Sequence, residues 1–198
     1  MTLPAVILAG GRASRMGGGD KVLLDLGGKP LLAHVIERLR PQAGPLAISA
    51  NGDPARFASF GLPVLADSLP DFPGPLAGIL AAMDWAADRD ARAVISVAGD
   101  TPFLPVDLVE RLQQAAGPAG LALAADTDAQ GLVRMHPTFG LWPVALRADL
   151  RAALSAGQGR IRTFTDPREA KTALFDSRNQ PFFNINTPAD LTRALALQ

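Results

Sequence analysis

Residues 4–21 read PAVILAGGRASRMGGGDK, and this stretch carries the strongest indication of the fold. Ala5–Leu8 is a short apolar run of strand length that stops at Ala-Gly-Gly. The ten residues from Gly10 onward contain five glycines, and three cations lie among or just after them. Glycine permits positive φ angles and close backbone approach, so successive N–H groups can point inward as an anion-binding nest. We therefore predict a strand followed by a polyphosphate-binding loop, with Arg15 and Lys21 supplying full positive charges.

The glycine spacing excludes two better-known phosphate-binding motifs. The dinucleotide fingerprint needs G-x-G-x-x-G at the start of a helix, whereas the glycines here are adjacent. The Walker motif needs a Gly-Lys-Ser/Thr ending, which Gly19-Asp20-Lys21 does not match. Gly28-Lys29-Pro30 fails as well, because Leu23 occupies the place of the leading glycine. A Rossmann-type dehydrogenase is not expected, and the alternative for this loop is a flexible surface segment with solvated charges.

Apolar runs of strand length alternate with segments of helical period along the rest of the chain. Strands are expected over Ala5–Leu8, Pro45–Ser49, Pro63–Leu65, Ala93–Val97 and Gly120–Ala124. Helices are expected over Pro30–Arg40, Pro54–Phe60, Leu76–Ala87 and Pro105–Ala116. Pro30 and Pro105 suit first helical turns, and Thr187 is a predicted N-cap of the last helix. Thr138–Trp142 is a further strand, expected to run antiparallel and to precede a helix that ends near Ala156.

This alternation predicts an α/β fold, a three-layer α/β/α sandwich with a mostly parallel Rossmann-like sheet and one antiparallel strand. We find no repeat, low-complexity tract or linker in the 198 residues, so a single domain is expected. Nineteen basic residues balance nineteen acidic ones, which argues against a nucleic-acid surface and a polybasic membrane patch. The lack of cysteine excludes thiolate nucleophiles and Cys-based metal sites. The apolar stretch Pro4–Leu8 is too short for a signal-peptide core or a membrane span, so the expected location is the cytoplasm.

Polar side chains follow the predicted strands, where ligands of parallel α/β sheets bind. Asp100, after Ala93–Val97, can hold Mg²⁺, which typically uses one or two carboxylates together with water and phosphate oxygens. The alternative is that Asp100 caps the helix that begins near Pro105. Asp67 is either a ligand or a turn-stabilising residue, and Asn51 either meets a purine edge or ends a turn.

The string LAGGRASRMGGGDK resembles the signature L-A-(G/A)-G-x-(S/A)-x-R-M-G-x-D-K of the nucleotidyltransferases with a Rossmann-like fold. The stretch from Asp67 to Pro102 resembles one branch, the molybdenum cofactor guanylyltransferases, through D-S-x-x-D-(F/Y)-P-G-P-L-A-G and a later D-T-P. The sister cytidylyltransferases usually show L-A-A-G and D-Q-P at these places. Gly10-Gly11 and Thr101 therefore favour GTP over CTP.

The resemblance implies eight GTP-binding residues after the first strands. They are Leu8, Ala9, Gly10, Gly11, Lys21, Asn51, Asp67 and Asp100. The first three would touch the base, while Asn51 and Asp67 would contact guanine and ribose. The expected catalytic residues are Arg15, Lys21 and Asp100, and Asp100 would also bind the Mg²⁺ cofactor.

The C-terminal half holds the expected acceptor side. Asn184 and Asn186 share one face of an extended segment, and the family motif N-x-N-T-P implies that they bind molybdopterin; the alternative is that they cap the final helix. Arg160 and Arg162 either clamp the acceptor phosphate or lie in a solvated turn. The role of His136 stays open, because a phosphate nucleophile is already anionic and needs no strong base.

The implied reaction transfers GMP from GTP to the terminal phosphate of molybdopterin or Mo-molybdopterin and releases pyrophosphate. Molybdoenzyme-maturation proteins are further expected partners, whereas nucleic acid and membranes are not. One alternative is another nucleotidyltransferase that uses CTP or a sugar phosphate. Another is a non-catalytic domain that binds GTP or a molybdopterin compound. The resemblance extends over nearly all of residues 1–198, which we expect to form one nucleotidyltransferase domain.

Overall fold

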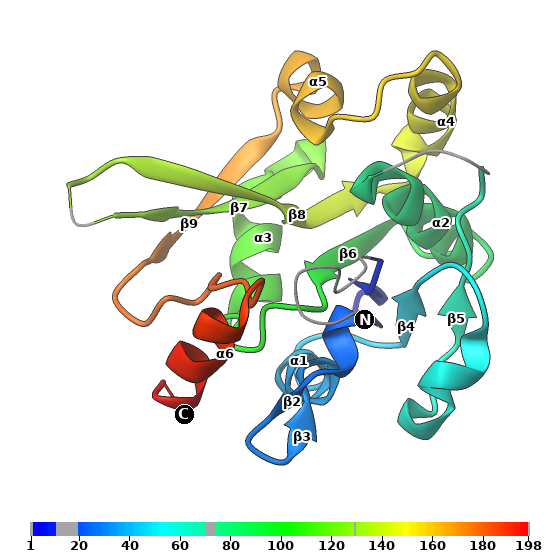
Figure 1. Cartoon of the computed structure of the whole chain (residues 1–198). Coiled ribbons are helices and arrows are strands. Elements are labelled where there is room, and N and C mark those ends of the chain that lie inside the picture. Colours follow the sequence, from blue (N-terminus) through cyan, green and yellow to red (C-terminus); the bar gives the residue numbers. More distant parts are fainter. Residues whose placement is uncertain (1, 11–19, 70–73, 129, 198) are drawn as a thin grey trace.

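The computed structural model describes residues 2–10, 20–69, 74–128 and 130–197. Its centre is a seven-stranded sheet with the order β5-β4-β1-β6-β8-β7-β9 (Figure 1). The strands of this sheet are β1 Ala5–Leu8, β4 Leu46–Ser49, β5 Val64–Leu65, β6 Ala93–Ala98, β7 Ala122–Thr127, β8 Val133–Pro143 and β9 Lys171–Asp176. The α-helices are α1 Leu31–Leu39, α2 Pro75–Ala87, α3 Leu108–Ala116, α4 Arg147–Ser155, α5 Ile161–Thr165 and α6 Pro188–Leu195.

Strand directions in the sheet match the predicted α/β class. β1 pairs in parallel with β4 on one side and with β6 on the other, and β5 continues the parallel set. β8 is antiparallel to both β6 and β7, while β9 is parallel to β7. The predicted antiparallel strand at 138–142 is therefore confirmed as part of β8. Because β1, β4 and β6 run the same way, their carboxyl ends meet at one edge of the sheet.

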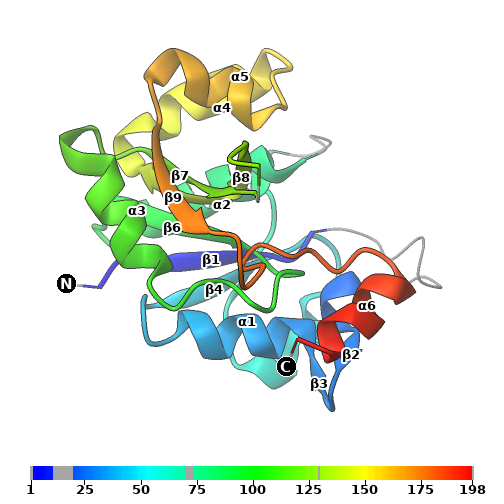
Figure 2. The ribbon, with the colours of Figure 1, turned by 90° about the vertical axis from the view of Figure 1, so that its left-hand side faces the viewer.

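Helices cover both faces of the sheet. One core cluster joins the strands to α1 and α3, and the other joins them to α2, α4 and α5. Figure 2 shows α1 on one side of the strands and α4 and α5 on the other. The helix α2 is apolar almost all round because it lies between the sheet and α4. The three-layer arrangement predicted from the alternating pattern is confirmed.

A small lobe completes the fold. The two-stranded hairpin of β2 (Asp25–Leu26) and β3 (Lys29–Pro30) packs against α6 through a separate apolar cluster. The predicted N-cap is confirmed: Thr187 and Asp190 form a capping box at the start of α6. The segment before α6 is thereby held against the rest of the chain.

The structure differs from the sequence-based expectations at several element boundaries. Pro30 is the N-cap of α1 and belongs to β3, and α3 begins at Leu108, so neither Pro30 nor Pro105 lies in a first helical turn. The predicted helix at 54–60 is a 3₁₀ segment capped by Asp53. β9 and α5 were not expected, since their sequence lacks a long apolar run. Among the described residues, no helix has the length and apolarity needed to cross a bilayer.

Candidate active site

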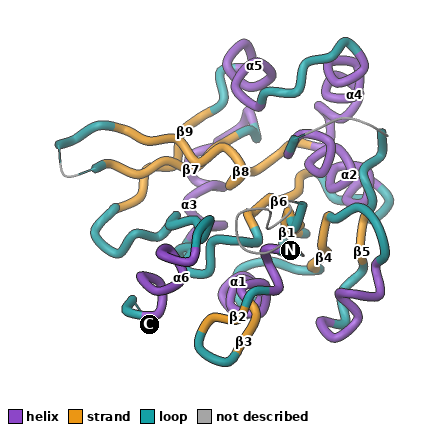
Figure 3. The backbone as a smooth tube through the Cα atoms, in the orientation of Figure 1, coloured by secondary structure: helices purple, strands orange, loops and turns teal. Residues whose placement is uncertain are grey.

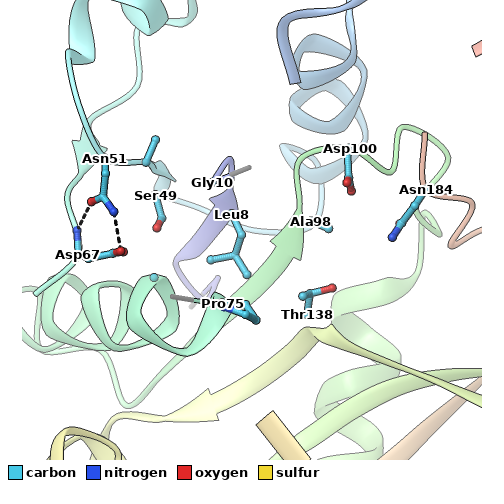
Figure 4. Close-up of a pocket in the computed structure, with 13 residues that line it drawn as sticks. Leu8, Gly10, Ser49, Asn51, Asp67, Pro75, Ala98, Asp100, Thr138 and Asn184 are labelled. Atoms are coloured by element: carbon cyan, nitrogen blue, oxygen red, sulfur yellow. Dashed lines mark hydrogen bonds between the residues drawn. The ribbon is translucent and has the colours of Figure 1, made fainter. Parts of the chain in front are cut away.

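A cavity of about 510 Å³ lies at the carboxyl ends of β1, β4 and β6. Its lining residues come from seven segments of the chain. They are Leu8, Gly10, Ser49, Ala50, Asn51, Asp67, Gly74, Pro75, Gly78, Ala98, Asp100, Thr138 and Asn184. Figure 4 shows two polar groups on opposite sides of this space, Asn51 with Asp67 and Asp100 with Asn184. The position agrees with the rule that parallel α/β sheets bind ligands beyond their strand ends, and the volume falls in the range of small-molecule sites.

Asn51 and Asp67 form a reciprocal pair on the first side. Asn51 Nδ2 donates to Asp67 Oδ2 at 2.6 Å, and the Asp67 backbone N–H donates to Asn51 Oδ1 at 2.9 Å. The two residues follow the neighbouring strands β4 and β5, which explains how positions sixteen apart in sequence meet. The pair presents a carboxylate and an amide at the cavity wall.

Arg56 connects this side of the cavity to Asp20, the residue before Lys21. Its guanidinium donates to the backbone carbonyls of Asn51 and Asp53, each at 2.5 Å, and Arg56 Nε lies 2.6 Å from Asp20 Oδ2. The same group stacks over Phe57, with 4.6 Å between the guanidinium carbon and the ring centroid. A planar fork with five N–H donors is suited to such multiple contacts.

Lys21 and Asp100 form the main charged pair of the second side. Lys21 Nζ lies 2.5 Å from Asp100 Oδ2, and both side chains are largely buried. The same ammonium donates to Asn186 Oδ1. A lysine ammonium has three hydrogens to donate, so a further one can meet a phosphate oxygen.

The extended segment before α6 is bound to the Asp100 loop. The Ile185 N–H donates to the Asp100 carbonyl at 3.1 Å. Thr101 Oγ1 lies 2.5 Å from Asn184 Oδ1 and 3.2 Å from Asp100 Oδ1, and its single hydrogen serves one of them at a time. The segments around residues 21, 100 and 184–186, far apart in sequence, therefore form one cluster.

Two glycines permit close packing beneath the cavity. A Cβ atom on Gly78 of α2 would lie 2.6 Å from Ser49 Oγ and 3.1 Å from a Leu8 methyl carbon. A Cβ atom on Gly99 would lie 2.9 Å from Val22 and 3.2 Å from the Leu8 carbonyl oxygen. These positions bring α2 and the Asp100 loop against the end of β1.

Most of the site residues predicted from sequence lie at this cavity. Leu8, Gly10, Asn51, Asp67, Asp100 and Asn184 line it, while Lys21 and Asn186 join it through Asp100. Ala9 is buried and its N–H bonds to the Ser49 carbonyl, so its side chain does not line the cavity. Gly11 and Arg15 lie outside the described residues. Ser49 and Thr138 also line the cavity and were not predicted, although Ser49 ends a predicted strand and Thr138 begins one.

The two histidines lie outside the cavity lining. His34 Nε2 lies 2.9 Å from the Leu26 carbonyl oxygen, a contact that links α1 to β2. His136 stacks on Phe182, and its Nε2 atom lies 3.2 Å from Oδ1 of the buried Asp126. Arg134 makes two hydrogen bonds to the same carboxylate.

The ionisation of this cluster follows from its burial and contacts. Burial lowers the pKa of His136 below its usual value of 6.5, and contact with Asp126 only partly opposes this. Burial alone would raise the pKa of Asp126, but Arg134 and His136 outweigh it and lower that pKa. The cluster therefore favours an ionised Asp126 beside a neutral His136.

Arg160 and Arg162 were possible ligands of the acceptor phosphate. Arg162 is strongly exposed, and its Nε atom lies 3.5 Å from Asp166 Oδ2. Arg160 is the exposed N-cap of the short helix α5. Neither lines the cavity.

The donor atoms present fit a hard cation that is shared with a substrate. The described residues contain no group of three or more His, Asp or Glu side chains that could enclose a metal ion. The Asp100 carboxylate faces the cavity (Figure 4), and Mg²⁺ is commonly held by one or two carboxylates with water and phosphate oxygens. Asp100 is thus a suitable ligand for Mg²⁺ that arrives with a triphosphate.

An α/β sheet with a polar cavity at its parallel strand ends is compatible with a nucleotidyltransferase, and sequence comparison assigns the chain to that enzyme class. Residues 5–172 match the family described as MobA-like NTP transferase domain. The chain belongs to this family.

Relatives across the full length support this assignment. A protein of Rhodopseudomonas palustris named molybdenum cofactor guanylyltransferase is 53% identical over 96% of this chain and 91% of its own length. One of the same name from Cereibacter sphaeroides is 51% identical over 100% and 97%. The crystal structure of molybdopterin-guanine dinucleotide biosynthesis protein A from Archaeoglobus fulgidus has a TM-score of 0.71, with 23% identity and 98% of each chain covered. The resemblance to molybdenum cofactor guanylyltransferases is thereby confirmed, and the structural likeness supports the fold.

Proposed function

We propose that this enzyme transfers GMP from GTP to the terminal phosphate of molybdopterin, forming molybdopterin guanine dinucleotide and pyrophosphate. The observation that carries the proposal is the cavity with the Asn51–Asp67 pair on one side and the Lys21–Asp100–Asn186 cluster on the other. Full-length relatives named molybdenum cofactor guanylyltransferase support the choice of substrates.

The Asn51–Asp67 side is suited to the base of the donor nucleotide. The Watson–Crick edge of guanine carries adjacent N1–H and N2–H donors, and a carboxylate can accept from both. Cytosine offers an amino group beside an acceptor nitrogen, which gives a poorer match to a carboxylate. Asp67 therefore favours GTP over CTP, and Leu8 and Gly10 border the same space.

The Lys21 side is suited to the phosphates. Lys21 follows the glycine-rich segment in the sequence. We expect Gly11 and Arg15 of that segment to contact the triphosphate. A bound Mg²⁺ ion, held by Asp100 and phosphate oxygens, would offset the repulsion between the two anionic substrates. Asn184 and Asn186 lie beside Asp100, which fits the proposal that they bind the acceptor.

In the proposed reaction an acceptor phosphate oxygen attacks the α-phosphorus of GTP in line with the bond that breaks. A new P–O bond forms, the bond to the α,β-bridging oxygen breaks, and pyrophosphate leaves with the negative charge. The attacking phosphate is already ionised near neutral pH, so no general base is required. Lys21 would stabilise charge on the phosphates, and positioning supplies most of the remaining acceleration.

The direct test is to incubate the protein with molybdopterin, Mg²⁺ and one nucleoside triphosphate at a time. We expect mass spectrometry to detect molybdopterin guanine dinucleotide, with an equal amount of pyrophosphate, from GTP. A cytosine dinucleotide formed preferentially from CTP would contradict the assigned base. Tight GTP binding without any dinucleotide would instead indicate a non-catalytic binding domain, and product formed only with a sugar phosphate would change the acceptor.

A further inference from the structure

We propose that Asp84 is a positioning residue that orients the Asp67 carboxylate toward the nucleotide base, acting through Ser68. This inference rests on the proposed function, because it concerns the base side of the same cavity. Asp84 lies on α2 and is not among the residues that line the cavity. Its effect on the site must therefore pass through the residues that it contacts.

The first of these contacts is a hydrogen bond between Asp84 and the loop after β5. Ser68 Oγ donates to Asp84 Oδ2 at 2.5 Å. Ser68 directly follows Asp67, so the bond fixes the backbone on the C-terminal side of Asp67. On the other side, the Asp67 backbone N–H is held by Asn51 Oδ1 at 2.9 Å. The residue that presents the carboxylate is thus anchored at both ends.

Asp84 is itself held by the neighbouring helix. One guanidinium nitrogen of Arg151, on α4, lies 2.9 Å and 2.7 Å from the two Asp84 oxygens. Arg147, at the start of α4, adds a second positive charge, with its Nε 3.7 Å from Asp84 Oδ1. Figure 1 shows α4 beside α2, and both helices belong to the core cluster on one face of the sheet. Since Asp84 is partly buried, its carboxylate has few alternative positions.

This network has a defined consequence for binding. A carboxylate pairs with two adjacent N–H donors only when both oxygens point along the donor directions. A loop that is free to move must be ordered upon binding, which weakens the complex. Loss of the Ser68–Asp84 bond therefore weakens contacts with the base more than contacts with the phosphates, which the separate Lys21 cluster supplies.

The comparison of GTP with ITP isolates this effect. Inosine retains N1–H but lacks the 2-amino group, so the ratio of their dissociation constants reports how well the carboxylate meets the guanine edge. We would measure both constants by calorimetry with Mg²⁺ for the wild-type protein and for variants. Such binding measurements need no acceptor, so they are independent of the transfer reaction.

We expect the wild-type protein to prefer GTP over ITP by about tenfold or more, the discrimination that a paired hydrogen-bonding contact provides. Ser68→Ala and Asp84→Asn should each lower this ratio by about threefold or more, because the first removes the hydrogen bond to Asp84 and the second replaces its charged acceptor, and its partner for Arg151, by a neutral amide. Ser68→Thr, which keeps the hydroxyl, should retain the ratio. Asp149→Asn is the matched control: it breaks a 3.1 Å ion pair between α4 and Arg168 that does not touch the loop.

Two results would overturn the positioning role of Asp84. One is an unchanged ratio in both Ser68→Ala and Asp84→Asn while Asp67→Asn loses it. The other is an equal weakening of GTP and ITP binding, which indicates general loss of structure. If Asp67→Asn itself keeps the wild-type ratio, the base does not contact Asp67, and the base assignment in the proposed function falls together with the role of Asp84. Thermal unfolding of each variant verifies that it is folded.

Discussion

At the scale of single residues, the ion pair Lys21–Asp100 is the main charged contact of the second side of the cavity. A partly buried ion pair leaves an uncompensated charge when one partner is removed. In the proposed reaction the Lys21 ammonium would also offset the negative charge of the phosphates, and the Asp100 carboxylate would hold the Mg²⁺ ion. Their removal should therefore affect catalysis far more than the loss of an exposed pair.

We predict that Asp100→Ala and Lys21→Ala each reduce turnover by at least about 10²-fold, as expected for removal of one transition-state stabiliser. The control is Lys29→Ala, which breaks an exposed ion pair with Glu37 and should leave turnover unchanged. Steady-state pyrophosphate release measures all three. Near-normal turnover of the Asp100 variant would exclude its role in holding the metal ion.

A second residue-scale prediction concerns pH. Burial lowers the pKa of His136, so between that pKa and about 6.5 the unfolded chain binds more protons than the folded one. The free energy of unfolding should then fall as pH decreases from about 7 through this window. Asp126, whose pKa is lowered, stays ionised there and loses its stabilising contribution only at more acidic pH.

Urea unfolding at a series of pH values tests this account. The variant His136→Gln lacks the titrating imidazole and should show a weaker pH dependence between about 5 and 7. Parallel curves for wild type and variant would show that His136 does not titrate differently on folding. Because His136 lies outside the cavity lining, we expect turnover of the variant at pH 7.5 to stay close to that of the wild type.

At the scale of elements, the segment before α6 links the small lobe, made of β2, β3 and α6, to the site. Asp190 Oδ2 accepts hydrogen bonds from the backbone N–H groups of Asn186 and Thr187, at 2.9 Å and 2.8 Å. Thr187 completes the capping box by accepting from the Asp190 N–H. Asn186 is therefore placed by the start of the helix as well as by Lys21.

We predict that Thr187→Ala lowers the free energy of unfolding by about 1 kcal/mol through loss of the N-cap. Because Asn186 is adjacent, the KM for molybdopterin should rise while the KM for GTP stays unchanged. Chemical denaturation and steady-state kinetics measure the two effects. A rise in the KM for GTP alone would place Asn186 on the donor side.

Elements with an apolar run could be predicted from sequence, and elements without one could not. β1 occurs at the predicted residues, and β4, β5 and β6 differ by one residue at an end. β9 alternates exposed and buried positions at the sheet edge, and the first half of β8 has no buried residue, mixes polar with apolar side chains and contains Pro137. Figure 3 shows the β7–β8 hairpin extending away from the rest of the sheet, and its described residues 130–134 are exposed.

At the scale of the whole molecule, the sheet order brings the site together. The order β5-β4-β1-β6 places the strand ends and following loops that carry Asp67, Asn51, Leu8 and Asp100 side by side. Strand ends and motifs therefore allowed these residues to be predicted from sequence. The contacts of Arg56 and of Asp84 could not be predicted, because they depend on how helices and loops pack in three dimensions.

The central claim is that one cavity binds the guanine base at Asn51–Asp67 and the triphosphate at Lys21–Asp100. A crystal structure with Mg²⁺ and a non-hydrolysable GTP analogue tests it most directly. We predict that the base lies against Asp67, that the phosphates contact Lys21 and the residues after Gly10, and that a metal ion touches Asp100. A nucleotide bound elsewhere, or one whose phosphates point away from Lys21 with Asp100 free of metal, would contradict the account.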